Sequence, residues 1–237
     1  MQQNAFSERV ALVTGASRGI GAAMARQLAA GGAHVILVAR SLGGLEAVDD
    51  EIREAGNHPA TLVPMDLKQH DLIDQLASTI YQRWGKLDIL VGNAGTLGAL
   101  TPLAHADPKI WDEVFGVNVT ANYRLIRSMD PLLRQSDAGR AVFVTSGAAR
   151  TATAYWGPYA ASKAALEHMI HIYAQELEGS SVRANLFDPG IVRTKMRAQA
   201  FPGEAKDRLA DPADIAKQML DLLTVKCSQQ GDTILAA

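Results

Sequence analysis

Cysteine is nearly absent from the sequence, and the single Cys227 excludes a disulfide framework and a zinc site built on cysteines. Aromatic residues are also scarce at 5%, which leaves few side chains on which nucleic-acid bases could stack. Neither sign of charge dominates, because 23 basic and 25 acidic side chains give a net charge of −2. We therefore expect neither a nucleic-acid partner nor an acidic membrane partner.

Long apolar runs are missing too. No stretch reaches the roughly 18 apolar residues that a membrane span needs, and the segment Met1–Arg9 is polar, unlike the core of a signal peptide. With one cysteine besides, a cytoplasmic location is expected. The 48% hydrophobic content excludes intrinsic disorder. At 237 residues, we expect a single domain that covers the whole chain, 1–237.

Short apolar runs alternate with longer amphipathic segments along the chain. The predicted strands are Arg9–Val13, His34–Val38, Ala60–Pro64, Leu87–Val91, Arg140–Thr145, Ser181–Phe187 and Asp232–Leu235. The predicted helices are Gly19–Ala30, Leu42–Ala55, Gln69–Trp84, Pro108–Arg134, Tyr155–Glu178 and Pro212–Leu223. Strands that are apolar throughout are typical of sheets covered on both faces. The alternation predicts right-handed crossovers and an α/β fold with a parallel sheet of about seven strands.

Two helix starts and one long loop stand out. Asp107-Pro108 and Asp211-Pro212 each combine an N-cap residue with a proline at the first helical position. The segment from Pro189 to Ala210 is the longest without a predicted element. Loops of this length in a compact domain are often functional, so we expect a substrate lid at about 190–211.

A glycine-rich loop follows the first predicted strand and opens the first helix. Gly15 permits a tight turn, Gly19 lets the backbone approach a pyrophosphate, and Gly21 lets helix and strand pack closely. The helix N-terminus then offers free N–H groups to phosphates. Glycines also make ordinary turns, but the position after the first strand favours dinucleotide binding.

The end of the second predicted strand indicates which dinucleotide binds. Sites for NAD usually place an acidic residue here to bond the ribose 2′-hydroxyl, whereas this strand ends Val38-Ala39-Arg40-Ser41. Arg18 lies within the glycine-rich loop itself. Two guanidinium groups suit a 2′-phosphate, so NADP(H) is predicted over NAD(H). The alternative is that both arginines are solvated surface residues.

Tyr159 and Lys163 are four residues apart and would share one face of a helix. Alone the pair is only suggestive. Ser146 ends the fifth predicted strand 13 residues before Tyr159, and ligands of open α/β sheets bind at the carboxyl ends of strands.

At this point the chain resembles the short-chain dehydrogenase/reductase family over nearly its whole length. The segments that match are the loop Thr14–Gly21, the pair Asp66-Leu67, Asn93-Ala94-Gly95, the tetrad Asn118, Ser146, Tyr159 and Lys163, and Pro189-Gly190 followed by Thr194. The resemblance implies a single Rossmann-fold domain whose doubly wound parallel sheet has the strand order 3-2-1-4-5-6-7. It also implies a homodimer or homotetramer, assembled through the helices Pro108–Arg134 and Tyr155–Glu178.

The resemblance assigns residues to the cofactor and the substrate. The expected cofactor-binding residues are Gly15, Ser17, Arg18, Gly19, Ile20, Gly21, Arg40, Ser41, Asp66, Leu67, Asn93, Ala94, Gly95, Tyr159, Lys163, Pro189, Gly190, Ile191 and Thr194. The expected substrate-binding residues are Ser146, Ala148, Trp156 and Tyr159. No metal is expected, since His168 and His171 lack a third ligand by motif.

The implied chemistry is carbonyl reduction or alcohol oxidation. NADPH would supply the hydride and Tyr159 the proton, with Lys163 favouring the phenolate and bonding the ribose. Ser146 would donate a hydrogen bond to the carbonyl oxygen. Asn118 would hold a water that joins Lys163 to solvent, although alone it would be interpreted as a polar residue on a helix face or at a kink.

Finer resemblances leave the substrate open. Segments such as Ser136–Gly139, Trp156-Gly157 and Asp211–Ile215 are similar to YciK-type bacterial oxidoreductases. Gly92 departs from the family, which often has asparagine there, and the chain stops soon after Leu235.

Three hypotheses remain for the function. The first is a reductase of a small-molecule carbonyl, and the second is a 3-oxoacyl-thioester reductase that uses an acyl-carrier protein. The basic residues of the expected lid outnumber its acids and weakly favour the second, while the alternative is an ordinary solvated loop; they are Arg193, Lys195, Arg197, Lys206 and Arg208. The third is a sensor or scaffold that binds NADPH without turnover, against which the complete tetrad argues.

Overall fold

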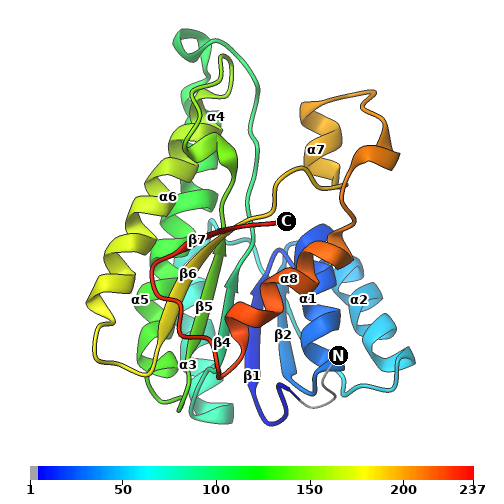
Figure 1. Cartoon of the computed structure of the whole chain (residues 1–237), viewed down its shortest axis with the longest axis vertical. Coiled ribbons are helices and arrows are strands. Elements are labelled where there is room, and N and C mark those ends of the chain that lie inside the picture. The colour runs from blue at the N-terminus through cyan, green and yellow to red at the C-terminus, as the bar shows by residue number, and fades with distance from the viewer. Residues whose placement is uncertain (1–4) are drawn as a thin grey trace.

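The predicted apolar runs form one parallel sheet in the computed structural model, which describes residues 5–237 (Figure 1). Only the first four residues of the polar segment Met1–Arg9 lie outside the described residues. The strands within that range are β1 (Val10–Thr14), β2 (His34–Ala39), β3 (Thr61–Pro64), β4 (Ile89–Gly92), β5 (Arg140–Val144), β6 (Arg183–Asp188) and β7 (Thr233–Leu235). Their order is β3-β2-β1-β4-β5-β6-β7 and every neighbouring pair is parallel, which confirms the predicted fold class and strand order.

Helices cover both faces of this sheet. The α-helices of the described chain are α1 (Gly19–Ala30), α2 (Leu42–Glu54), α3 (His70–Trp84), α4 (Pro108–Phe115), α5 (Ala121–Leu133), α6 (Gly157–Glu176), α7 (Lys195–Ala200) and α8 (Pro212–Leu223). Helices α1, α2 and α8 pack on one face, and α3, α5 and α6 on the other (Figure 1). Among these helices, none combines the length and the apolar character needed to span a bilayer.

The apolar strands are explained by this double cover. In β1, Ala11 and Val13 pack into the layer of α1 and α8, while Val10 and Leu12 pack into the layer of α3 and α5. Each fully buried large apolar side chain contributes about 1.5–3 kcal/mol. A strand with a polar face would lose that contribution on one side, so both faces of the central strands must be apolar.

Helix caps agree with the predicted punctuation. Asp107 accepts a hydrogen bond from Lys109 N, and Asp211 accepts one from Ala213 N, both at 2.8 Å. Each is therefore an N-cap, and the helices α4 and α8 begin at the prolines that follow.

The helix predicted over Pro108–Arg134 is continuous as far as Leu133, but the prediction missed a π-helical segment within it. This segment, η2 (Gly116–Thr120), lies between α4 and α5. The sequence keeps a helical pattern through this region, so periodicity alone does not reveal the wider turn. Asn118 lies at the centre of η2, and its side chain is bound to residues of two other elements, as described below.

Several element ends differ from the prediction by one or two residues; β4, for example, begins at Ile89 rather than at Leu87, and β6 at Arg183 rather than at Ser181. Tyr155 has a φ of +73°, a left-handed conformation that a helix interior excludes, so α6 begins at Gly157 rather than at Tyr155. The expected lid is not without structure, because it contains α7 and the 3-10 turn η4 (Lys206–Arg208). Thr194 caps α7 by accepting a hydrogen bond from Arg197 N at 3.1 Å.

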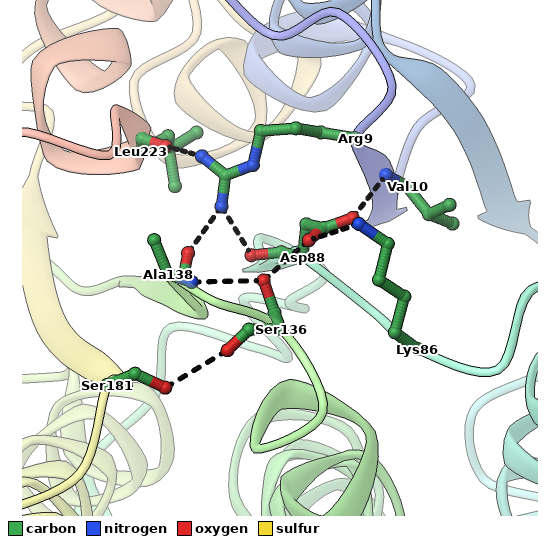
Figure 2. Close-up of polar contacts among 8 residues, drawn as sticks. All are labelled: Arg9, Val10, Lys86, Asp88, Ser136, Ala138, Ser181 and Leu223. Atoms are coloured by element: carbon green, nitrogen blue, oxygen red, sulfur yellow. Dashed lines mark hydrogen bonds and ion pairs between the residues drawn. The ribbon is translucent and has the colours of Figure 1, made fainter.

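A buried polar network ties the amino ends of the strands together (Figure 2). The carboxylate of Asp88, 3% exposed, accepts hydrogen bonds from Val10 N at 2.9 Å, Lys86 Nζ at 3.1 Å and Ser136 Oγ at 2.5 Å. The guanidinium of Arg9 donates to three backbone carbonyls, those of Asp88, Ala138 and Leu223. This network lies at the opposite end of the sheet from the strand carboxyl ends, which remain free for a site.

Candidate active site

A cleft of about 720 Å³ lies at the carboxyl ends of the strands, where the strand order reverses between β1 and β4. Ligands of open α/β sheets bind at this position. The predicted residues that line it are Gly15, Ser17, Arg18, Gly19, Ile20, Arg40, Ser41, Asp66, Leu67, Asn93, Ala94, Gly95, Ser146, Trp156, Tyr159, Lys163, Pro189, Gly190 and Thr194. In the part of the chain that the structure describes, Gly21, Asn118, Ala148 and Ile191 do not line it.

At two positions of the glycine-rich loop, Gly15 and Gly21, there is no room for a larger side chain. Gly15 has a φ of +66°, and a Cβ there would lie 2.8 Å from Asn93 Nδ2. A Cβ on Gly21 would lie 2.4 Å from Gly15 O, so this glycine permits α1 to pack closely on the loop, as its spacing predicts. Gly19 has a φ of +57° and opens α1, whose N-cap residue Arg18 makes no side-chain cap. The first-turn amides are therefore available to a phosphate group.

Asn93 fastens the loop to the neighbouring strand. Its Nδ2 donates to Thr14 O at 2.9 Å, while Asn93 N and Ala94 N donate to Thr14 Oγ1 at 3.0 and 3.1 Å. The departure at Gly92 also has a reason in the packing, because a Cβ there would lie 2.3 Å from a ring carbon of Phe143. Phe143 fills the space that an asparagine would need.

The far end of the cleft carries unpaired positive charge. Arg18 and Arg40 are exposed and line the cleft, and within residues 5–237 neither forms an ion pair. Ser41 caps α2 by accepting from Gly44 N at 3.2 Å, so it positions the helix beside Arg40. These residues fit a dinucleotide that carries a further phosphate.

Tyr159 and Lys163 lie in the first two turns of α6, facing the end of β5. Both are buried, with 7% and 4% of their surface exposed. Lys163 Nζ donates to Val144 O at 2.7 Å and lies 5.9 Å from the centre of the Tyr159 ring. Ser146 follows β5 and accepts a hydrogen bond from Ala148 N at 3.3 Å. The three residues of the predicted tetrad that reach the cleft are thus brought together.

Burial is the main cause of the shifted pKa values of Tyr159 and Lys163. Burial raises the pKa of Tyr159; a hydrogen bond with Ser146 lowers it, and the charge of Asp188 adds to the rise. The pKa of Lys163 is lowered to about 8, because burial outweighs the opposing charges of Glu167 and Asp188. The surroundings that the chain itself provides therefore favour a neutral Tyr159.

Asn118 does not face the cleft but holds the parts around it. Its Oδ1 accepts from Thr96 N at 2.8 Å, and its Nδ2 donates to Thr96 O at 3.0 Å and to Ser162 Oγ at 2.9 Å. Ser162 Oγ donates in turn to the backbone carbonyl of Tyr159 at 2.7 Å. Asn118 therefore links the loop after β4 to the helix that carries Tyr159 and Lys163.

Aromatic side chains form the outer wall beside Tyr159. The Trp156 ring lies edge-on to Tyr159 at 5.9 Å and tilted toward Phe201 at 5.8 Å. Phe201 directly follows α7, and Gln199 of that helix donates to Gly98 O at 3.3 Å. The expected lid is therefore in contact with the loop on the other side of the cleft.

Two of the basic residues of the lid, Arg193 and Arg197, are paired with acids. Arg197 makes two hydrogen bonds of 2.6 Å to Glu204 and stacks on Phe201 at 3.7 Å. Arg193 is paired with Asp211. Lys195 lines the cleft and forms no ion pair within residues 5–237, so part of the expected positive charge still faces the cleft.

Sequence reasoning missed several lining residues. Thr96 and Leu97 continue the predicted Asn93-Ala94-Gly95 segment, and Met65 precedes the predicted Asp66, so strand ends alone would have indicated them. Arg26 and Val192 carried no motif. No group of three or more potential metal ligands occurs within the described residues, and His171 Nδ1 contacts Gly231 O at 2.9 Å.

The chain is similar to known proteins over almost its full length. The profile of the short chain dehydrogenase family matches residues 9–205. The oxidoreductase YciK of Escherichia coli K12 is 40% identical over 225 residues, which cover 94% of this chain and 88% of YciK. The NADPH-dependent pterin aldehyde reductase of Arabidopsis thaliana is 32% identical over 227 residues, 95% of this chain and 92% of the reductase.

Solved structures agree with the sequence comparison. A short chain dehydrogenase from Escherichia coli CFT073 complexed with NADPH has a TM-score of 0.94 and 38% identity, and the match covers 99% of each chain. One from Shigella flexneri 2a complexed with NADP has a TM-score of 0.95 at the same identity and coverage.

Proposed function

The chain belongs to the short-chain dehydrogenase/reductase family and is an oxidoreductase, and we propose that it uses NADPH to reduce the carbonyl group of a small molecule, or NADP to oxidise the corresponding alcohol. The observation that carries the proposal is the placement of Tyr159 and Lys163, buried on one helix, in the same cleft as the uncapped start of α1. This arrangement joins a proton donor to a phosphate-binding loop.

The cofactor is assigned to NADP(H) on two grounds. Arg18 and Arg40 line the cleft without a carboxylate partner in the described chain, and no acidic residue ends β2. The two structural neighbours complexed with NADPH and NADP, and the NADPH-dependent relative from Arabidopsis thaliana, support the same choice. Gly15, Gly19 and the first-turn amides of α1 would hold the pyrophosphate.

The proton is assigned to Tyr159. NADPH, when bound, supplies the hydride to the carbonyl carbon. Tyr159 is neutral at physiological pH because burial raises its pKa, so it can give a proton to the carbonyl oxygen. Ser146, its hydrogen-bond partner, favours the phenolate that results and orients the carbonyl oxygen.

Lys163 and Asn118 support this proton transfer. Lys163 uses one of its three N–H donors on Val144 O, which leaves two for ribose hydroxyls. Its positive charge would stabilise the Tyr159 phenolate. Asn118 would fix the distance between the loop at Thr96 and α6, and would hold the water that connects Lys163 to solvent.

The substrate is proposed to be a small uncharged carbonyl compound. Trp156, Tyr159 and Met196 give the substrate side of the cleft an apolar wall. The alternative, a 3-oxoacyl thioester on a carrier protein, keeps the support of Lys195 at the cleft but not that of Arg193 and Arg197, which are paired with acids of the lid. The pterin aldehyde reductase among the relatives favours a planar aldehyde as one compound to test.

The remaining expectations concern organisation. We propose one domain over residues 1–237 with a substrate lid at about 190–211, a cytoplasmic location, and a homodimer or homotetramer. Tyr123 of α5 and Ile172 of α6 are 50% and 48% exposed, which supports assembly through these helices. Light scattering that finds only the 25.3 kDa protomer would contradict the oligomer.

The test is NADPH oxidation followed by absorbance against ketones, aldehydes, quinones and 3-oxoacyl thioesters, with NADH run in parallel. Turnover that is lost in Tyr159→Phe would support the proposal, and the best substrate would separate the small carbonyl from the thioester. Preference for NADH would overturn the roles of Arg18 and Arg40. NADPH binding without turnover on any class would favour the sensor.

A further inference from the structure

Two buried acids lie behind the proposed proton donor without a role in the reaction. Glu167 and Asp188 are 8% and 6% exposed. Glu167 lies on α6, one turn beyond Lys163, and Asp188 is the last residue of β6, directly before Pro189-Gly190 of the cleft. Acids are rarely buried unless a cation or hydrogen bonds compensate them.

One arginine compensates both acids. Arg150 lies just after the 3-10 turn η3 (Gly147–Ala149), and its Nη1 donates to Glu167 Oε1 while its Nη2 donates to Asp188 Oδ2. Within residues 5–237, no other cation forms an ion pair with either carboxylate. The guanidinium is planar and always charged, so it can hold two carboxylates in one fixed arrangement.

Hydrogen bonds fix the carboxylates from the other side. Thr145 Oγ1 donates to Glu167 Oε1 at 2.8 Å, and Gly190 N donates to Asp188 Oδ1 at 3.1 Å. The cluster thus joins the segment that carries Ser146, the helix that carries Tyr159 and Lys163, and the strand end that leads into the cleft. Arg150 itself does not line the cleft in the described chain, so it would act through the residues it holds.

The charges of the cluster balance. Arg150 and Lys163 are cations from the loop and from α6, and Glu167 and Asp188 are anions from α6 and β6, so the four charges sum to zero. Both acids raise the pKa of Lys163, and Asp188 also raises that of Tyr159. Ser146 is the other group that acts on Tyr159. Removal of Arg150 would leave a net negative charge beside both groups.

We propose that Arg150 is a positioning residue, which clamps Glu167 and Asp188 so that the Ser146 segment, α6 and the end of β6 keep their arrangement, and which offsets the two negative charges beside Tyr159 and Lys163. This inference rests on the proposed reductase function. It assigns Arg150, Glu167 and Asp188 to the reaction although none of them touches the substrate.

The test compares Arg150→Met with wild type in kcat, in the KM for NADPH and in the pH dependence of NADPH binding, followed by cofactor fluorescence. We expect kcat to fall about ten- to a hundredfold, because small displacements of reacting groups have effects of this size. In wild type, NADPH affinity should fall at high pH as Lys163 loses its proton; we call this fall the basic limb of the binding curve. In Arg150→Met the basic limb should move up by about one pH unit, because the two acids, no longer offset by Arg150, stabilise the Lys163 ammonium. Arg150→Lys keeps the positive charge but loses the planar guanidinium that binds both carboxylates at once. The basic limb should therefore return to its wild-type pH, while kcat should recover only in part.

Matched variants separate the charge from the fold. Asp188→Asn should move the basic limb of NADPH binding to lower pH, because one anion that stabilises the Lys163 ammonium is gone. The double variant Arg150→Met/Asp188→Asn should return the limb toward its wild-type pH. Arg53→Gln is the control: it removes an arginine that is paired with Asp49 at 3.9 Å on α2, and it should change neither kcat nor the pH of the basic limb.

The proposal would be overturned if Arg150→Met kept the wild-type kcat and lost NADPH affinity at the same pH as wild type. If that variant does not fold, an unmoved limb in Asp188→Asn does the same. Because NADPH binding needs no substrate, a wild-type protein that binds NADPH but reduces nothing would refute the proposed reaction and still leave the effect of the clamp measurable.

Discussion

Asn118 and Thr96 hold each other through two reciprocal hydrogen bonds, one from Thr96 N to Asn118 Oδ1 at 2.8 Å and one from Asn118 Nδ2 to Thr96 O at 3.0 Å. The pair joins the π-helical segment η2 to the loop that follows β4. π-Helical turns are rare and are found most often at functional sites, where they place a side chain that a regular helix would turn away. Here the turn places an amide that satisfies a backbone N–H and a backbone C=O together.

Replacing Asn118 by alanine tests this link. The change leaves Thr96 N and Thr96 O without their partner and removes one of the two hydrogen bonds of the Ser162 hydroxyl, and each polar group left unpaired away from water costs about 1–3 kcal/mol. We expect lower stability in urea and a kcat for carbonyl reduction that falls tenfold or more. Ser162→Ala removes only one of these bonds and should have a smaller effect on both. Equal effects of the two variants would show that the Thr96 pair is unimportant.

Asn118 also shows where sequence reasoning reached its limit. Its match to the family tetrad could be read from spacing, but its partners could not, because Thr96 and Ser162 are 22 and 44 residues away. The π-helical segment was missed for the same reason. The sequence around it has a continuous helical pattern, and the tertiary contacts of Asn118 accompany the wider turn.

Other features were predictable because they are local. Helix α8 was predicted with the bounds Pro212–Leu223 that the structure has, since the N-cap Asp211 and the proline lie next to each other in the sequence. The seven strands were recognised because both faces of each central strand are buried. The ion pairs of Arg197 and Arg150 join residues from 7 to 38 positions apart, so the charge of the lid and the role of Asp188 could not be inferred from composition.

Carbonyl reduction should become slower as the pH rises through about 8. The pKa of Lys163 is lowered to about 8, so its ammonium dominates below that value and is lost above it. Tyr159 stays protonated over the same range because its pKa is raised. The measurement is kcat/KM with NADPH against pH, with circular dichroism at each pH to confirm that the protein stays folded. A profile that is still flat one unit above this value would contradict a role for the Lys163 charge.

Replacing Arg40 by aspartate should exchange the cofactor preference. Arg40 lines the cleft, and each hydrogen bond that a charged group makes contributes about 1.5–3 kcal/mol, so NADPH affinity should fall roughly ten- to a hundredfold. The introduced carboxylate can accept a hydrogen bond from the 2′-hydroxyl of NADH, whose affinity should rise. Fluorescence titration with both cofactors measures the two effects in one protein. A parallel loss of both affinities would mean that the substitution damages the loop rather than the recognition of the phosphate.

The network around Asp88 should matter for stability and not for activity. Asp88→Ala leaves Val10 N and Ser136 Oγ without their acceptor in a buried site (Figure 2), and breaking a buried charge network costs about 3–5 kcal/mol. The site lies at the amino ends of the strands, away from the cleft, so kcat/KM of the folded fraction should stay at the wild-type value. Lys86→Ala is the matched control, because its side chain is 39% exposed and makes one contact with Asp88, whereas Asp88→Ala also removes the acceptor of Val10 N and Ser136 Oγ. Urea unfolding separates the two variants, and equal midpoints would show that the hydrogen bonds of Asp88 to Val10 and Ser136 do not hold the strands together.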